Sequence, residues 1–343
     1  MNILLSSVGR RAYLVDYFKS AVAPLGGKVL CTNTSMDATG MIAADIPFIV
    51  PYADSPEFIP ALLNICGKNN VSLLFSLHDW ESLYIAKAKA MFEEIGTLPV
   101  MPDFNVMKTC LDKYATINKA KELGINTPAT FLTRDELKKA LDAKTLRFPI
   151  IIKPRCGQGS LGLFKVNSWA ELTSAYELLM IKKSEIQLNS DLLYNLDESG
   201  LLFQECIDGV EYGCDIVNDL NGNFATTFVK MKTAMRSGET DGAETVNCPQ
   251  ITDTAEKISS WSKHPGNMDA DFIINEYGKP VLLDLNPRFG GGYPFSHAAG
   301  ADIPGACISW RNGKQPTLRQ LSVDIGIRAY KAISMLKKQP CNL

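Results

Sequence analysis

The first 101 residues alternate between short apolar runs and amphipathic stretches, and this alternation constrains the fold more than any other feature. One intervening stretch, 11–27, has Leu14, Phe18 and Val22 at helical spacing, as a helix does that buries one face. Strands that alternate with helices pair in parallel, so we predict a doubly wound α/β domain. The apolar runs stand at 2–6, 28–32, 46–50, 72–77 and 99–101.

No dinucleotide fingerprint follows the first of these runs. The stretch "SSVGRR" at 6–11 holds one glycine, where the phosphate turn of a dinucleotide-binding fold needs three. A nicotinamide-binding domain is therefore not predicted.

A lysine stands before a glycine-rich loop, not after it. Lys153 closes the apolar run "FPIIIK", and Gly157, Gly159 and Gly162 follow, ahead of a second strand-like run, "SLGLFKV". A P-loop has the opposite order, with the lysine after the glycines and a helix next. We therefore predict two strands joined by a glycine-rich turn. The motif order alone leaves open what this turn binds.

The stretch 268–292, "MDADFIINEYGKPVLLDLNPRFGGG", predicts a second hairpin. If its arms pair symmetrically about "EYGK", Asp271 lies opposite Asp284 and Asp269 lies opposite Asn286. Alternate residues of a strand share one face, so these four side chains would cluster there. Like charges directly opposite each other destabilise a sheet, and a cation among them would remove that cost. Oxygen ligands suit Mg²⁺, which usually arrives with nucleotide phosphates; the alternative is a solvated strand face.

Composition narrows the class of protein. The net charge of −2 offers no basic surplus for nucleic acid, and no apolar stretch approaches the roughly 20 residues that span a bilayer. The N-terminal residues do not have the sequence pattern of a signal peptide. The nine cysteines form no C-x-x-C pair and the three histidines have no metal-ligand spacing, which favours reduced thiols. We therefore expect a cytoplasmic protein that binds neither nucleic acid nor membrane.

Five motifs follow one another along nearly the whole chain. They are "DKYATINKAKELGINTP", "IIIKPRCGQGSLG", "LFQECIDGVEYGCDI", "DADFIINEYGKPVLLDLNPR" and "FGGG". None is specific alone, but the ordered series resembles the ATP-grasp superfamily, which includes D-alanine–D-alanine ligase, biotin carboxylase and carbamoyl-phosphate synthetase. The likeness is nearest to stand-alone relatives of the carbamoyl-phosphate synthetase large subunit.

The resemblance implies three domains. A Rossmann-like parallel-sheet domain would occupy 1–108, and a small α+β lid with the glycine loop would occupy 109–200. A C-terminal antiparallel-sheet domain with the metal site would occupy 201–343. In such proteins the lid closes over the triphosphate, which answers what the glycine loop binds.

The resemblance also implies a nucleotide site for ATP. Lys113 and Lys153 would contact its phosphates, and the backbone amides of the loop would cover them, because such amides and a point charge suit an anion. Glu205 and the backbone of the next two residues would read the adenine edge, and Glu211 would hold the ribose. The loop residues are Gly157, Gln158, Gly159, Ser160 and Gly162, and the two residues after Glu205 are Cys206 and Ile207.

By the same likeness Asp271, Asp284 and Asn286 would ligate two Mg²⁺ ions, with Mn²⁺ as the alternative. The middle ligand of the family is more often glutamate, and Asp269 would stand behind the ligands. Arg288 matches the arginine that stabilises the transferred phosphoryl group, for which a planar bidentate donor is suited.

Substrate residues are less defined. Lys232 and Arg236 lie in a polar stretch, 230–246, that resembles a mobile loop meeting the carboxylate and amine, or is simply solvated. Four residues after strands of the first sheet stand where open α/β sheets bind ligands. These are Arg10, His78, Asp79 and Glu81, and Tyr293 and Phe295 in "GGYPFSH" would shape the same pocket.

The resulting expectation is an ATP-dependent carboxylate–amine ligase that works through an acyl phosphate. Its partners would be a small carboxylate and an amine, amino acids among them, and a homodimer is one expected assembly. Two alternatives stay open. One is a kinase on the same fold, and the other is a nucleotide-binding module without turnover.

Overall fold

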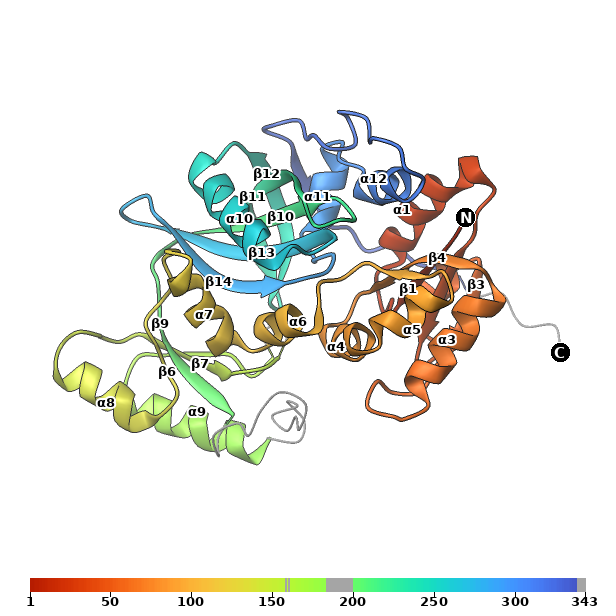
Figure 1. The fold of residues 1–343 in the computed structure, drawn as a ribbon. Coiled ribbons are helices and arrows are strands. Elements are labelled where there is room, and N and C mark those ends of the chain that lie inside the picture. Colours follow the sequence, from red (N-terminus) through yellow and green to blue (C-terminus); the bar gives the residue numbers. More distant parts are fainter. Residues whose placement is uncertain (158, 160, 183–199, 338–343) are drawn as a thin grey trace.

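The computed structural model describes residues 1–157, 159, 161–182 and 200–337. These residues form three β-sheets, one parallel and two antiparallel (Figure 1). None of the helices in this described part combines the length and the apolar character needed to cross a bilayer.

The first sheet is parallel, with strand order β3-β2-β1-β4-β5, and the predicted doubly wound domain is confirmed. One apolar cluster packs α1 against one face, and a second packs α3 and α5 against the other. The strands are β1 (Asn2–Ser6), β2 (Val29–Asn33), β3 (Ile46–Ile49), β4 (Val71–Ser76) and β5 (Leu98–Pro99). The helices are α1 (Ala12–Val22), η1 (Ala23–Leu25), α2 (Thr39–Ala43), α3 (Phe58–Lys68), α4 (Asp79–Lys87) and α5 (Lys89–Glu94).

The glycine loop joins two antiparallel strands, as predicted, in a four-stranded sheet of order β6-β9-β7-β8 (lower left in Figure 1). Its apolar cluster is made by residues between 129 and 203 alone, so this unit has its own core. The strands are β6 (Thr130–Phe131), β7 (Ile150–Pro154), β8 (Phe164–Val166) and β9 (Leu201–Glu205), and the helices are α8 (Arg134–Asp142) and α9 (Trp169–Ile181). Strand β9 belongs to this sheet although it lies after position 200, where the predicted lid domain ends.

The third sheet is antiparallel, with order β14-β13-β10-β11-β12-β15. Helix α10 covers one face together with residues of α6 and α7. The strands are β10 (Gly209–Asn218), β11 (Phe224–Arg236), β12 (Glu239–Val246), β13 (Gly266–Asn275), β14 (Pro280–Asn286) and β15 (Arg328–Tyr330). The helices are α6 (Phe104–Leu111), α7 (Lys113–Glu122), α10 (Pro249–Ser262), α11 (Tyr293–Ala298) and α12 (Ile303–Arg311).

The interpretation of 230–246 as a mobile loop is wrong. These residues form most of a long hairpin, β11–β12, in which Arg236 pairs with Glu239. Ser237 and Gly238 make its two-residue turn with φ angles of 50° and 78°. Positive φ at both turn residues matches the twist of the flanking strands, so a tight hairpin replaces the loop.

The β13–β14 hairpin pairs Asp271 with Asp284 and Asp269 with Asn286, as predicted. The turn, however, is one residue shorter than the symmetric count assumes, since Phe272 pairs with Leu282. Leu283 is an extra residue on β14, and this β-bulge restores the predicted register at the acids. It also lets Leu282 and Leu285 both enter the core while Asp284 shares a face with Asp271.

An aromatic cluster joins the first and third sheets just beyond β14. The ring of Phe289 lies 5.7 Å from Phe18, 6.0 Å from Phe75 and 4.8 Å from Tyr293, measured between centroids. Phe18 and Phe75 belong to α1 and β4, whereas Tyr293 begins α11. The segment after β14 is therefore anchored in the core that the two sheets share.

Candidate active site

Two lysines neutralise the acidic face of the β13–β14 hairpin. Lys232 Nζ lies 2.6 Å from Asp271 Oδ1, and Lys113 Nζ lies 3.0 Å from Asp284 Oδ2. The opposed carboxylates therefore do not face each other uncompensated, which would destabilise the ribbon. Asn286, the third predicted ligand, accepts a hydrogen bond from Arg288 at 3.3 Å.

These oxygen donors fit Mg²⁺ that arrives with phosphate, not a metal centre complete in itself. No group of three or more His, Cys, Asp or Glu side chains in the described ranges could hold a metal ion. Two carboxylates and an amide are a typical protein contribution when phosphate oxygens and water complete the Mg²⁺ shell. Binding there would require Lys113 and Lys232 to release their carboxylates.

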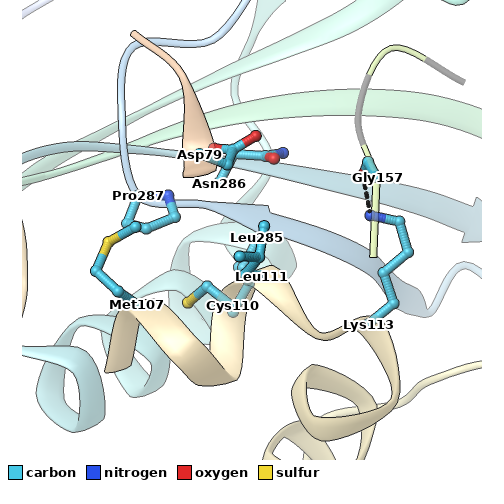
Figure 2. Close-up of a pocket in the computed structure, with 9 residues that line it drawn as sticks. All are labelled: Asp79, Met107, Cys110, Leu111, Lys113, Gly157, Leu285, Asn286 and Pro287. Atoms are coloured by element: carbon cyan, nitrogen blue, oxygen red, sulfur yellow. Dashed lines mark hydrogen bonds between the residues drawn. The ribbon is translucent and has the colours of Figure 1, made fainter. Parts of the chain in front are cut away.

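Lys113 lies at the entrance of the glycine loop. It is the first residue of α7, and its Nζ donates to the carbonyl of Gly157 at 2.8 Å (Figure 2). Asp112 caps this helix by accepting from Tyr114 N, and it also receives two hydrogen bonds from Arg155, at 2.8 and 2.7 Å. This capping network fastens α7 to the strand that leads into the loop.

Lys153, the last residue but one of β7, is a buried lysine without a carboxylate partner among the described residues. Its exposed fraction is 8%, and it makes no ion pair or hydrogen bond through its side chain with any residue the structure describes. Burial and the charge of Lys113 lower the pKa of Lys153 to about 8, although Asp284 and Asp271 act in the opposite direction. An anion beside this ammonium group would remove that cost.

The residues predicted to read adenine and ribose lie on β9, β10 and the link between them. Glu205 accepts from the backbone N–H of Ala129 at 3.0 Å, so its carboxylate is tied to the lid sheet. Cys206 and Ile207 follow, half-buried, and Glu211 lies 3.5 Å from Lys232. Gly157, Gly159 and Gly162 have φ angles of 155°, 64° and 75°, whereas Gln158 and Ser160 lie outside the described residues.

Arg288 forms a two-pronged ion pair with Asp79, the first residue of α4. Its Nε and Nη2 donate to the two carboxylate oxygens at 2.7 and 2.9 Å, and both side chains are only 8% exposed. Burial would raise the pKa of Asp79, but the charge and hydrogen bonds of Arg288 outweigh it and lower that pKa. Asp79 was predicted to face the substrate; instead it orients the arginine, beside Asn286 (Figure 2).

Asp269 is a buried carboxylate with no side-chain partner among the residues the structure describes. Burial and the charges of Asp271 and Asp215 raise the pKa of Asp269 to about 7. Its carboxyl group fills the place of a side chain on Gly290, where an added Cβ would lie 2.0 Å from Asp269 Cγ. The first glycine of "GGG" therefore makes room for this carboxylate.

A cavity of about 1160 Å³ lies between the first and third sheets. Asp271, Asp284, Asn286 and Arg288 line one side of it, and residues after strands of the first sheet line another. Of the predicted pocket residues, Arg10, His78, Phe295, Lys232 and Arg236 line this cavity.

Besides Asp79, two predicted pocket residues do not line the cavity. Tyr293 is fully buried in the core, which contradicts its expected place in the pocket. Glu81 is also buried, and it accepts hydrogen bonds from Ser6 and Ser7 at 2.5 and 2.6 Å. It thereby holds the β1–α1 loop instead of meeting a ligand.

Two parts of the site escaped the sequence analysis. Lys230 is ion-paired with Asp215 and donates to Ser296 at 3.1 Å, all three being buried beneath the cavity. Strand β15 and the segment after it, residues 328–336, form a further wall. Lys230 and Lys232 alternate along β11, and this pattern indicates a strand with one face toward charged partners. No sequence pattern indicated strand β15.

Comparison with known proteins gives two consecutive family matches. The PylC-like N-terminal domain matches residues 3–100, and the ATP-grasp domain matches residues 110–292. The chain is 26% identical over 236 residues to vancomycin/teicoplanin A-type resistance protein VanA of Enterococcus faecium, covering 64% of each. It is 26% identical over 200 residues to D-alanine–D-alanine ligase of Corynebacterium jeikeium, covering 51% of this chain and 48% of that one.

A third relative is the arginine-specific carbamoyl phosphate synthase large chain of Bacillus subtilis. It is 22% identical over 239 residues, which cover 66% of this chain and 21% of the relative. The chain thus spans less than two thirds of the length of each of these relatives.

The fold is that of a biotin carboxylase domain. The structure of this domain from Hydrogenobacter thermophilus 2-oxoglutarate carboxylase, a dimer solved with MgADP and bicarbonate, aligns with a TM-score of 0.73. The match covers 95% of this chain and 73% of that one at 16% identity. The fold predicted from the motif series is confirmed.

Gly290→Ala should destabilise the protein because its new methyl group would collide with the Asp269 carboxyl group. We expect the free energy of unfolding to fall by about 1–3 kcal/mol, as for other overpacked sites. The matched control is Gly291→Ala, where the nearest atom to an added Cβ is Lys331 Nζ at 3.7 Å. Chemical denaturation of both variants checks this, and equal stability of the two would contradict the close approach.

Proposed function

The chain belongs to the ATP-grasp domain family, and we propose that it is an ATP-dependent carboxylate–amine ligase. ATP would phosphorylate a carboxylate to give an acyl phosphate and ADP. An amine would then attack the acyl carbon, phosphate would leave, and an amide would remain after loss of a proton. The ligase among the relatives named above supports this reaction class.

The observation that carries the proposal is the charge arrangement around one face of the β13–β14 hairpin. Asp271 and Asp284 are each held by a lysine, and the cation Lys153 has no anionic partner within the described ranges. A nucleotide triphosphate with its metal satisfies all of these groups together. Phosphate oxygens would take the lysines, and the freed carboxylates would take the cation.

Each group would then have a distinct task. Lys113 and Lys153 would bind phosphate oxygens already present in ATP, and the glycine-loop amides would cover them. Asp271, Asp284 and Asn286 would hold Mg²⁺, which supplies charge neutralisation on the transferring phosphoryl group. Arg288, oriented by Asp79, would stabilise the charge that develops during transfer, since a preorganised donor needs no reorganisation at that moment.

The remaining assignments rest on the same proposal. Glu205, with the backbone of Cys206 and Ile207, would read adenine, and Glu211 would hold the ribose. We further propose the domain division 1–108, 109–200 and 201–343, with β9 as a strand added to the lid sheet. The eight described cysteines are all free thiols, which suits a cytoplasmic protein. Two metal ions and a homodimer are part of the proposal.

A phosphate-release screen tests the function. Amino acids and small carboxylates are supplied in pairs with ATP and Mg²⁺, and products are identified by mass spectrometry. We expect phosphate release that requires both an acid and an amine, with a new amide as product. A stable phosphorylated product would show a kinase instead, and ATP binding without turnover for any pair would show a nucleotide-binding module.

Lys153 and Arg288 should affect different steps. Lys153→Ala should weaken ATP binding as well as turnover because its ammonium group contacts phosphates in the ground state. Arg288→Ala should leave ATP affinity within a few-fold but lower the turnover number by roughly 10²–10³, the cost of losing one preorganised donor.

Calorimetry of ATP binding beside steady-state kinetics separates the two effects. Lys165→Ala is the matched control, since Lys165 is exposed on the neighbouring strand β8. An equal loss of ATP affinity in the Lys153 and Arg288 variants would make Arg288 a ground-state anchor and refute this division.

ATP binding should take up a proton at alkaline pH. With the pKa of Lys153 lowered to about 8, most molecules carry a neutral Lys153 at pH 8.5, and phosphate restores the charged form. We expect uptake of roughly half a proton or more per ATP at pH 8.5, falling toward zero at pH 6.5. Calorimetry in two buffers of different ionisation enthalpy measures it. Uptake that persists unchanged in Lys153→Ala would rule out this lysine.

Asp284→Asn should raise the Mg²⁺ concentration needed for half-maximal turnover by roughly tenfold or more, because one charged ligand is lost. Asp324→Asn is the matched control, since Asp324 is an exposed aspartate ion-paired with Arg319 at 2.8 Å. Mg²⁺ titrations of turnover compare the two. Overlapping titration curves for the Asp284 variant and the wild type would remove Asp284 from the metal site.

A further inference from the structure

The cavity between the first and third sheets has a surplus of positive charge at one end. Six of its basic side chains are ion-paired: Arg10, Lys230, Lys232, Arg236, Arg288 and Lys331. Arg11 also lines the cavity, and it has no carboxylate partner in the part of the chain that the structure describes. Its guanidinium group donates to the carbonyl of Leu77, at 2.9 Å, and is hydrogen-bonded to the side chain of Tyr13.

The surroundings of Arg11 do not supply the missing charge. Asp79 and Glu239 are the two carboxylates whose charges act on Arg11. Asp79 is already paired with Arg288, and Glu239 is shared by Arg10 at 3.4 Å and Lys331 at 3.8 Å. Four cations, Arg10, Arg11, Arg288 and Lys331, stand against these two carboxylates, which leaves a net charge of +2 at this end. Burial and the charge of Arg288 lower the pKa of Arg11, which agrees with an uncompensated cation in a partly desolvated place.

Backbone groups beside Arg11 add to the anion-binding character. Arg11 precedes α1, and no side chain in the described part of the protein caps this helix. Ala12 and Tyr13 line the same cavity, and their backbone amides have no acceptor among the described residues. The loop lies where β1 meets β2 on one side and β4 on the other, the place where open α/β sheets bind ligands.

We infer that the acid substrate carries a second anionic group, a carboxylate or a phosphate, and that Arg11 binds it. This inference rests on the proposed ligase function. The reacting carboxylate would lie between Arg288 and the acidic face, while the second group lies against Arg11 and the start of α1. Asp79 already takes the two-pronged side of Arg288, whereas Arg11 has no carboxylate partner among the described residues and can bind one.

The space between these two ends suits an extended molecule. The aromatic rings of Tyr17, Phe295 and Tyr330 line the cavity, and they offer apolar surface to a hydrocarbon spacer. The volume of about 1160 Å³ exceeds the usual range of ligand pockets, about 300–1,000 Å³, so a diacid fits beside the phosphates.

Hydroxamate formation tests the inference without knowledge of the amine, because hydroxylamine traps acyl phosphates. Each diacid is compared with a monoacid of the same length: glutarate with pentanoate, and glutamate with norvaline. O-phosphoserine with serine forms the phosphate arm, which distinguishes the two kinds of anion. We expect kcat/KM at least tenfold higher for the doubly acidic member of the preferred pair, and Arg11→Gln should reduce that ratio by roughly tenfold or more.

Arg311→Gln is the matched control, since Arg311 also donates to a backbone carbonyl, that of Gly96 at 2.8 Å, but lies outside the cavity. It should leave the ratio unchanged. Equal rates for mono- and diacids in the wild type would overturn the inference. So would an equal loss for both kinds of acid in Arg11→Gln, because Arg11 would then bind the reacting carboxylate.

Direct binding separates this inference from the proposed function. If no acid yields a hydroxamate, the ligase proposal fails, and calorimetry with glutarate and O-phosphoserine in the absence of ATP still tests Arg11. Binding weakened tenfold or more in Arg11→Gln supports the anion site, and affinity unchanged by that substitution refutes it.

Discussion

The ion pair between Arg288 and Asp79 connects the two halves of the candidate site. Arg288 follows strand β14 of the third sheet. Asp79 is the first residue of α4, which belongs to the domain of the first sheet, 209 residues away along the chain. Both side chains are almost fully buried, so removing either would leave an uncompensated charge, which typically costs 3–5 kcal/mol. The orientation of Arg288 therefore depends on how the first domain packs, and Phe289 fixes that packing through Phe18 and Phe75.

A second constraint is the acidic face opposite this pair. Two carboxylates in direct register would destabilise the hairpin, and Lys113 and Lys232 offset that repulsion. Because each carboxylate is paired with a lysine, phosphate can take the place of the carboxylates beside the lysines, and a metal cation can take the place of the lysines beside the carboxylates. Neither exchange leaves an unpaired charge. Lys153 has no carboxylate partner among the residues that the structure describes, so the triphosphate end of a nucleotide would complete the charge balance.

Much of this arrangement could be predicted from the sequence, for physical reasons that differ by element. The acids of β13 and β14 recur with the two-residue period of a strand, so their common face was predictable. The turn is one residue shorter than assumed, but the bulge at Leu283 shifts the register back by one residue, so the predicted pairs are still correct. The hairpin β11–β12 was missed because its polar residues face charged partners and a cavity. The role of Asp79 could not be foreseen, because nothing in a local pattern reports a partner that packing brings from another domain.

The most direct measurement is a double-mutant cycle between Asp79 and Arg288. Turnover numbers are compared for Asp79→Asn, Arg288→Gln and the double variant, with ATP affinity measured in parallel by calorimetry. If Asp79 acts by orienting Arg288, the double variant should be no slower than the slower single variant, and ATP affinity should stay within a few-fold in all three. Fully additive losses in turnover would contradict the account, because the two residues would then act independently.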